Sequence, residues 1–183
     1  MRLGISSYCL DREIENGILT LDEAIDWAAK YGAECMELVP FAFRFDDEVT
    51  GKIDLAKIAA VKKRAKDAGL ALVNYSVLAD FCKEGEDLEK EIARVCHHVD
   101  IAAELGVPRM RHDVTAFRRP LNQNTLKDFD RWLPVLAESA KRVTEHAKKL
   151  GVMTLIENHG FFANGCDRVE RILNAVNDDN YGL

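Results

Sequence analysis

The sequence predicts an α/β protein of the (β/α)8 TIM-barrel type, present as about five βα units and the start of a sixth strand. Short apolar runs alternate with longer amphipathic stretches, which implies a parallel sheet covered by helices. Glycines at positions 32, 69, 106 and 151 each end a helical stretch just before an apolar run. A doubly wound nucleotide fold would carry a glycine-rich turn after its first strand, and the turn at residues 6–11 has none. We therefore favour the barrel.

The first two helices have clear starting signals. Thr20-Leu21-Asp22-Glu23 is a capping box that opens an amphipathic helix running to about Tyr31. Asp54 can cap a second helix that runs to Ala68. The predicted strands of the chain lie at residues 3–8, 35–39, 70–77, 109–114 and 152–158.

Three further helices are expected from apolar residues at helical spacing. They cover residues 88–105, 125–150 and 165–176. Pro134 falls inside the second of these, and we expect it to break or kink that helix because proline removes a backbone donor.

The chain is short for a closed barrel. A barrel of this type takes roughly 250 residues, and this chain has 183. We expect residues 1–183 to form a single, incomplete barrel domain whose sixth strand begins near Asn180. Such a half-barrel leaves two open parallel edges. Either the protein continues, which we favour, or another chain completes the wall as a homo-oligomer.

Composition excludes several classes of protein. The net charge is −6 and no strong basic patch is present, which argues against nucleic acid as a partner. Five scattered cysteines without a C-x-x-C pair indicate reduced thiols rather than a disulfide framework. No secretory leader and no membrane-spanning run are recognised. We expect a cytoplasmic protein without a membrane partner.

The fifth predicted strand ends in polar residues, in the stretch LIENHG at residues 155–160. Because side chains alternate along a strand, Glu157 and His159 share one face. At the C-terminal mouth of a barrel, a carboxylate suits a divalent metal or general-base work, and an imidazole can hold a substrate hydroxyl or move a proton. The alternative is a buried glutamate satisfied by neighbouring donors, with His159 as a loop cap.

Earlier strands also carry polar residues. Arg111 and Asp113 share one face of the fourth strand, as a structural ion pair or as substrate contacts, and His112 takes the other face. Glu37 in the second strand is either a site residue or a buried hydrogen-bond anchor, since an unpaired buried acid is costly. Asn74 in the third strand is a weaker case of the same kind.

Three stretches together resemble the sugar phosphate isomerase/epimerase superfamily, the xylose isomerase-like barrels. They are RLGISSY at residues 2–8, LDEAI at 21–25 followed by YGAECMEL at 31–38, and LIENHG. The resemblance implies that Glu157 is a metal ligand that also exchanges a proton with the sugar, with His159 near the substrate. Glu37 matches the strand-two acid of the family. The implied cofactor is a divalent metal, Mn, Mg, Co or Zn, whose other ligands come from strands six to eight and lie outside these 183 residues.

We therefore expect a metal-assisted isomerase, epimerase or related dehydratase acting on a small sugar, keto sugar or polyol. We expect the substrate to contact several of the polar residues named above: His159, His112, Arg111, Asp113, Glu37 and Asn74. The 183 residues alone are expected to hold little metal and to be inactive. An alternative is a non-catalytic partial barrel that binds a ligand or self-associates through its open edges. We favour less an endonuclease IV-like repair enzyme, because such enzymes place histidines at the ends of strands three and four, where this chain offers Asn74 and His112.

Overall fold

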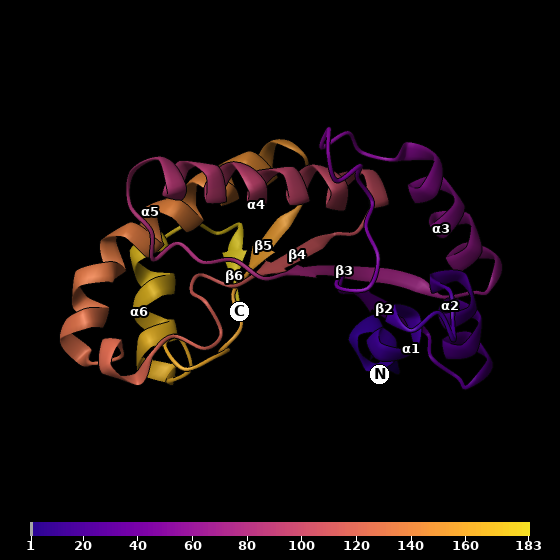
Figure 1. Cartoon of the computed structure of the whole chain (residues 1–183), viewed down its shortest axis with the longest axis horizontal. Coiled ribbons are helices and arrows are strands. Elements are labelled where there is room, and N and C mark those ends of the chain that lie inside the picture. Colours follow the sequence, from indigo (N-terminus) through magenta and orange to yellow (C-terminus); the bar gives the residue numbers. More distant parts are fainter. Residues whose placement is uncertain (1) are drawn as a thin grey trace. The chain divides into compact units, whose positions relative to one another are not determined.

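The computed structural model describes residues 2–183, whose strands belong to one six-stranded sheet (Figure 1). Strands follow one another in chain order, β1-β2-β3-β4-β5-β6, as the barrel prediction requires. The strands are β1 (Gly4–Ser6), β2 (Cys35–Leu38), β3 (Ala71–Val77), β4 (Arg109–His112), β5 (Met153–Leu155) and β6 (Tyr181–Gly182). The helices are α1 (Asp11–Glu15), α2 (Leu21–Lys30), α3 (Leu55–Asp67), α4 (Gly85–Leu105), α5 (Leu126–Lys149) and α6 (Cys166–Val176). The predicted α/β class and the start of a sixth strand are both confirmed.

The predicted helix signals work as expected. Thr20 caps α2 with its hydroxyl, and the Glu23 side chain bonds back to the Thr20 backbone, which completes the capping box. Asp54 accepts a hydrogen bond from the backbone N–H of Lys57, at 2.9 Å, at the start of α3. Helix α5 runs through Pro134 without a break, so the break that was one of the two expected effects of Pro134 is wrong, and the kink stays a prediction.

Several boundaries differ from the prediction. Strand β1 ends at Ser6 and not at residue 8, β4 ends at His112 and not at residue 114, and α4 begins at Gly85 and not at residue 88. Strand β5 ends at Leu155, earlier than residue 158, where its pairing with both β4 and β6 stops. One further ladder bond remains, from the Ile156 N–H to the Gly182 carbonyl at 2.9 Å. The turn expected at residues 6–11 forms a 3₁₀ turn at Ser7–Leu10, which is followed by α1.

The described chain divides into two compact units. Unit 1 holds the residues up to Ser76 together with Ile101–Pro108, and unit 2 holds Val77–Asp100 and Arg109–Leu183. Each unit has its own buried apolar residues, such as Ile25 and Met36 in unit 1 and Val143 and Phe162 in unit 2. The single incomplete barrel domain stays a prediction.

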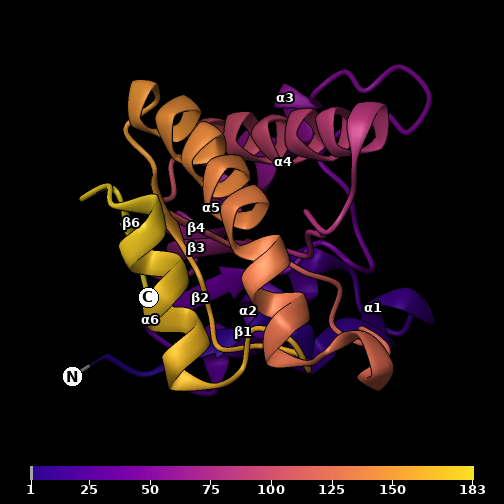
Figure 2. The ribbon, with the colours of Figure 1, turned by 90° about the vertical axis from the view of Figure 1, so that its left-hand side faces the viewer.

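In unit 2, helices cover one face of β4 and β5. The Thr154 hydroxyl of β5 lies 2.7 Å from the Thr144 hydroxyl of α5, so Thr154 points toward the helices. Met110 is opposite Thr154 in the register, so Met110 and, by alternation, His112 share that side. Helices α5 and α6 pack against each other (Figure 2).

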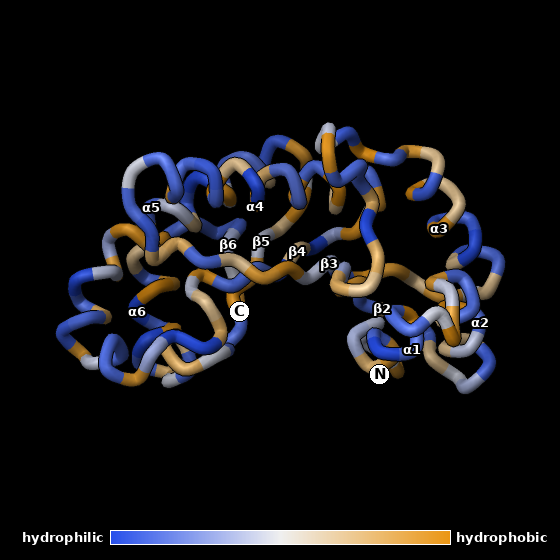
Figure 3. Tube along the Cα trace, viewed as in Figure 1, coloured by the Kyte–Doolittle hydropathy of each residue, from blue (hydrophilic) through white to orange (hydrophobic). Residues whose placement is uncertain are grey.

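The helices of unit 2 are amphipathic. Hydropathy changes repeatedly along α4 (Figure 3), where the buried residues Ile92, Val95 and Val99 recur three or four positions apart. None of the helices within residues 2–183 has the length and apolar character needed to cross a membrane.

Candidate functional site

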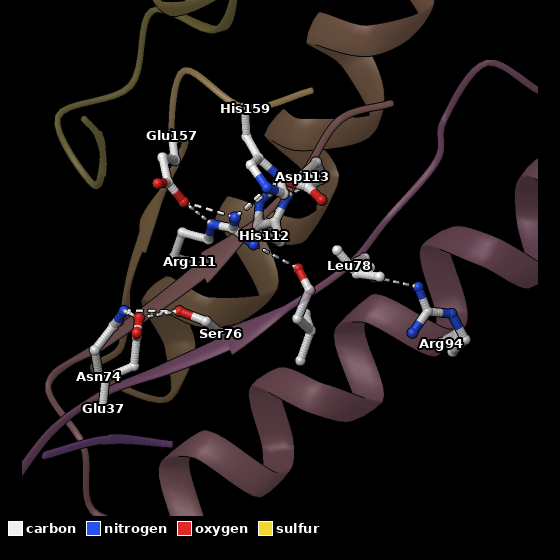
Figure 4. Close-up of polar contacts among 11 residues, drawn as sticks. Glu37, Asn74, Ser76, Leu78, Arg94, Arg111, His112, Asp113, Glu157 and His159 are labelled. Carbon is white, nitrogen blue, oxygen red and sulfur yellow. Dashed lines mark hydrogen bonds and ion pairs between the residues drawn. The ribbon is translucent and has the colours of Figure 1, made fainter. Parts of the chain in front are cut away.

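The clearest polar cluster of unit 2 joins the ends of β4 and β5 (Figure 4). Arg111 donates from Nε to Oε2 of Glu157 at 2.8 Å, and its Nη2 lies 2.6 Å from the same oxygen. Arg111 Nη1 also donates to the Val77 carbonyl at 3.4 Å. The parallel strands thus bring together two side chains that are 46 positions apart in the sequence.

His159 joins this cluster through its Nδ1 atom. That atom lies 3.0 Å from Oδ1 of Asp113 and 3.2 Å from Nη2 of Arg111. Nδ1 donates to Asp113 when it carries the ring proton and accepts from Arg111 when the proton is on Nε2. In both tautomers Nδ1 faces protein partners.

The four residues fall into two layers by exposure. The side chains of Arg111 and Asp113 are 12% and 5% exposed, whereas those of Glu157 and His159 are 54% and 29% exposed. Asp113 is therefore buried and Arg111 is largely covered, whereas Glu157 and His159 are the members that a small molecule can reach.

Asp113 is the most buried acid of the cluster. Burial raises the pKa of its carboxyl group, while the nearby charges of Arg111 and His159 act in the opposite direction. Its Oδ2 atom has no hydrogen-bond partner among residues 2–183. The predicted ion pair with Arg111 exists at 3.4 Å, but Glu157 makes the shorter contact to Arg111.

Phe117, which the sequence analysis did not single out, stacks beside the cluster. Its ring centroid lies 4.6 Å from that of His159 and 5.8 Å from that of Phe161. The Phe161 N–H donates to the Phe117 carbonyl at 3.0 Å. Phe117 lies in a loop without a periodic pattern, so the sequence offered no signal for it beyond its aromatic character.

Gly160, the last residue of LIENHG, permits this close approach. Its φ is +72°, and a Cβ atom there would lie 2.7 Å from the Phe117 carbonyl oxygen. Only glycine suits both the left-handed backbone and the contact between the two loops.

Unit 1 holds a separate polar cluster built on β2 and β3 (Figure 4). The Asn74 amide donates to Oε1 of Glu37 at 2.8 Å and to the Ser76 hydroxyl at 3.0 Å, and Ser76 donates to the same Glu37 oxygen. These hydrogen bonds are consistent with the interpretation of Glu37 as a hydrogen-bond anchor between two strands, one of the two interpretations given above. Ser76 was missed by the sequence reasoning. The predicted substrate contacts of Glu37 and Asn74 stay predictions.

His112 lies apart from the cluster, on the helix-facing side of β4. It is 0% exposed and packs between the rings of Phe81 and Tyr181, with centroids 5.8 and 5.9 Å away. Its Nδ1 contacts the Asp113 carbonyl at 2.9 Å. Burial lowers the pKa of His112 to about 4, so the imidazole is neutral at pH 7. Its predicted role in substrate binding gains no support from this position.

The donor atoms of the cluster do not by themselves suit a metal ion. Within residues 2–183, no three His, Cys, Asp or Glu side chains are arranged to hold one. One oxygen of Glu157 faces the Arg111 guanidinium, and a cation at the same position would meet like charge. Divalent metals such as Mg²⁺ also require about six ligands, more than these side chains offer.

Solved structures with the same fold include several sugar-processing enzymes. The chain matches a D-psicose 3-epimerase from Clostridium cellulolyticum H10, determined with D-tagatose, at 18% identity and a TM-score of 0.75, over 99% of this chain and 62% of that one. It matches a sugar phosphate isomerase/epimerase from Parabacteroides distasonis at 22% identity and a TM-score of 0.64, over 98% and 63%. It matches the IolI protein, determined with a bound zinc atom, at 16% identity and a TM-score of 0.69, over 100% and 62%.

At these identities the likeness shows the fold, and the chain spans less than two thirds of each of these three proteins. A comparison with curated proteins gave no match. The profile of one family, described as xylose isomerase-like TIM barrel, matches residues 25–183. With most of its length matched, and with parallel strands in barrel order, this chain belongs to the xylose isomerase-like TIM barrel family.

Proposed function

We propose that this chain supplies the substrate-facing pair Glu157 and His159 of an enzyme that isomerises or epimerises a small sugar, keto sugar or polyol. The observation that carries the proposal is the exposed Glu157 carboxylate, held at the C-terminal ends of parallel strands by a largely covered arginine. Membership of the family and the sugar-processing activities named for its structural neighbours support this class of substrate.

Glu157 is proposed to act as the general base at carbon. It takes the proton from a C–H bond beside the substrate carbonyl, and the electron pair of that bond forms an enediolate. Return of a proton to the neighbouring carbon gives isomerisation, and return to the other face of the same carbon gives epimerisation. His159 is proposed to bind a substrate hydroxyl, since its ring is partly exposed beside Glu157.

The resemblance to the family also implies a divalent metal that would polarise the carbonyl oxygen when bound. Among residues 2–183, no three His, Cys, Asp or Glu side chains are grouped so that they could hold such an ion. The steps assigned to this chain are therefore only those of Glu157 and His159.

The proposal is tested by deuterium exchange in the protein that carries this chain. The protein is incubated in D₂O with a panel of ketoses, and incorporation at the carbon beside the carbonyl is followed by proton NMR. Glu157→Gln should lower the exchange rate by about 100-fold or more, because general-base catalysis contributes at least that factor. Glu89→Gln, which breaks an exposed ion pair on α4 with Arg142, is the matched control and should leave the rate unchanged.

Exchange that survives Glu157→Gln would remove the role assigned to this carboxylate. The 183 residues alone are expected to exchange poorly. Rapid turnover by that chain would contradict only the expectation of an incomplete site.

A further inference from the structure

We propose that Arg111 is a positioning residue that holds Oε2 of Glu157 and leaves Oε1 as the oxygen that takes the substrate proton. The inference rests on the proposed function for its chemistry. Its structural part, the pinning of one carboxylate oxygen by a largely covered guanidinium, stands without that function.

The contacts to Glu157 are one-sided. Nε and Nη2 of Arg111 reach the same oxygen, Oε2, at 2.8 and 2.6 Å. A guanidinium that met the carboxylate edge to edge would engage both oxygens. Here the second oxygen stays on a side chain that is 54% exposed, and it can turn to a ligand.

Arg111 is itself fixed by other acceptors of unit 2. Its Nη1 bonds to the Val77 carbonyl at 3.4 Å, and its Nη2 lies 3.2 Å from Nδ1 of His159 and 3.4 Å from Oδ1 of Asp113. These partners lie at the ends of β3, β4 and β5, so three chain segments define the plane of the guanidinium. A planar cation with several donors suits this task, and the single ammonium of lysine does not.

Arg111 has little surface to offer a substrate. Only 12% of its side chain is exposed, so its influence must pass through Glu157 and His159. Loss of Arg111 should therefore slow the chemical step much more than it weakens substrate binding, which depends on Arg111 only through His159. A residue that bound the substrate would show the opposite division between kcat and KM.

The first experiment needs no activity. The Nε–H resonance of Arg111 is assigned in nitrogen–proton NMR spectra of the protein and of its Glu157→Gln and Glu89→Gln variants. Glu157→Gln should move this resonance because a carboxylate partner is lost, and Glu89→Gln should leave it in place. Glu157 is more than half exposed, so the variant is expected to fold. An Arg111 resonance that does not respond to Glu157→Gln would overturn the inference.

The second experiment measures kinetics for the Arg111→Lys and Arg111→Gln variants with the ketose that exchanges fastest. Both should lower kcat by about 10- to 100-fold with KM changed less than about threefold, because a misplaced catalytic group costs that much. Arg111→Lys should retain more activity than Arg111→Gln. A rise in KM at constant kcat would make Arg111 a substrate contact and overturn the inference. If no ketose exchanges, the proposed function fails, and the NMR result alone decides whether Arg111 pins Glu157.

Discussion

At the residue scale, His112 and His159 lie near the ends of neighbouring strands but differ in their exposure to solvent. His159 lies partly exposed beside Glu157, whereas His112 is fully buried between two rings on the helix side of β4. The difference follows from strand alternation, because Arg111 and His112 must point to opposite faces. Protonation of His112 is therefore less favourable in the folded chain than in the unfolded chain.

We expect His112 to make the protein less stable in mild acid. Its pKa is about 4 in the folded chain against 6.5 as a model value, so below pH 6.5 the unfolded chain binds a proton that the folded chain does not. The free energy of unfolding should fall as the pH drops from 6.5 toward 4, by up to about 3 kcal/mol from this group. Urea unfolding at several pH values measures the loss.

The control for this prediction is His112→Asn, whose amide can still donate to the Asp113 carbonyl. The difference between the two unfolding curves isolates His112 from the other histidines. If both proteins lose equal stability between pH 6.5 and 4, the buried neutral state assigned to His112 is wrong.

The residue pattern could be predicted only in part. Alternation separated His112 from Arg111 on β4. Glu157 and His159 both contact Arg111, but they follow the end of β5 at Leu155, so strand alternation is not what brings them together. Alternation could not pair Arg111 with Glu157, because that contact depends on how β4 and β5 align in space. Ser76 and Phe117 could not be predicted as members of these clusters, because neither a serine in a strand nor a phenylalanine in a loop belongs to a sequence pattern that indicates a functional site.

At the element scale, one glutamate of α4 fastens the loop that follows β3. Glu91 is 8% exposed and accepts from the Asp80 N–H at 2.9 Å, from Lys83 at 3.3 Å and from Arg94 at 2.8 Å. Arg94 in turn donates to the Leu78 carbonyl at 2.6 Å (Figure 4). Burial disfavours the charge, but the hydrogen bonds from Arg94 and Asp80 outweigh it and lower the pKa of Glu91 to about 2.

Glu91→Gln should lower the free energy of unfolding by about 1–3 kcal/mol, because a buried charged acceptor with several donors is lost. Glu89→Gln on the same helix breaks an ion pair whose side chains are largely exposed, and the loss there should be clearly smaller. Thermal unfolding of the two variants tests this order.

The loss of stability at acidic pH provides an independent test of Glu91. Because its folded pKa lies below the unfolded value, its contribution is present above pH 4.5 and is lost as the pH falls toward 2. The Gln variant should lack this part of the acid transition. Equal stabilities of the Glu91 and Glu89 variants would contradict the role given to the loop contact.

Element boundaries were predicted well where a side chain marks them. The Thr20 capping box, Asp54 and the glycines after the helices are local signals, and local physics decides them. The end of β5 was placed three residues too late, because the end of a strand depends on where its pairing with neighbouring strands stops, which its own residues do not reveal.

At the scale of the whole molecule, two compact units share one continuous helix. Residues 85–100 of α4 belong to unit 2, and the last turn of α4 belongs to unit 1. Helix formation is cooperative along a chain, so opening one part of α4 weakens the other. We expect the two units to unfold together.

The two tryptophans of the chain allow this to be measured. Trp27 of α2 lies in unit 1, and Trp132 of α5 lies in unit 2. The Trp132→Phe variant reports on unit 1 by fluorescence, and the Trp27→Phe variant reports on unit 2. In each variant the denaturant midpoint by fluorescence should coincide with the midpoint by circular dichroism. Separate midpoints would show two independently folding units.

The order of the strands was the most predictable property of the whole molecule, because repeated βα units allow few parallel topologies. The division into two units could not be foreseen from the sequence. The boundaries at Ser76 and Asp100 fall inside β3 and α4, where no change of composition marks them.

The contact between Gly160 and Phe117 has a consequence for anyone who wishes to engineer this scaffold. The loop after β5 donates to the loop after β4, and a side chain at position 160 would strike the Phe117 backbone. We therefore expect that replacing one loop alone would disturb the conformation of the other loop. Libraries that aim at a new substrate range should therefore transplant the two loops as a matched pair from one parent, with the glycine kept between them.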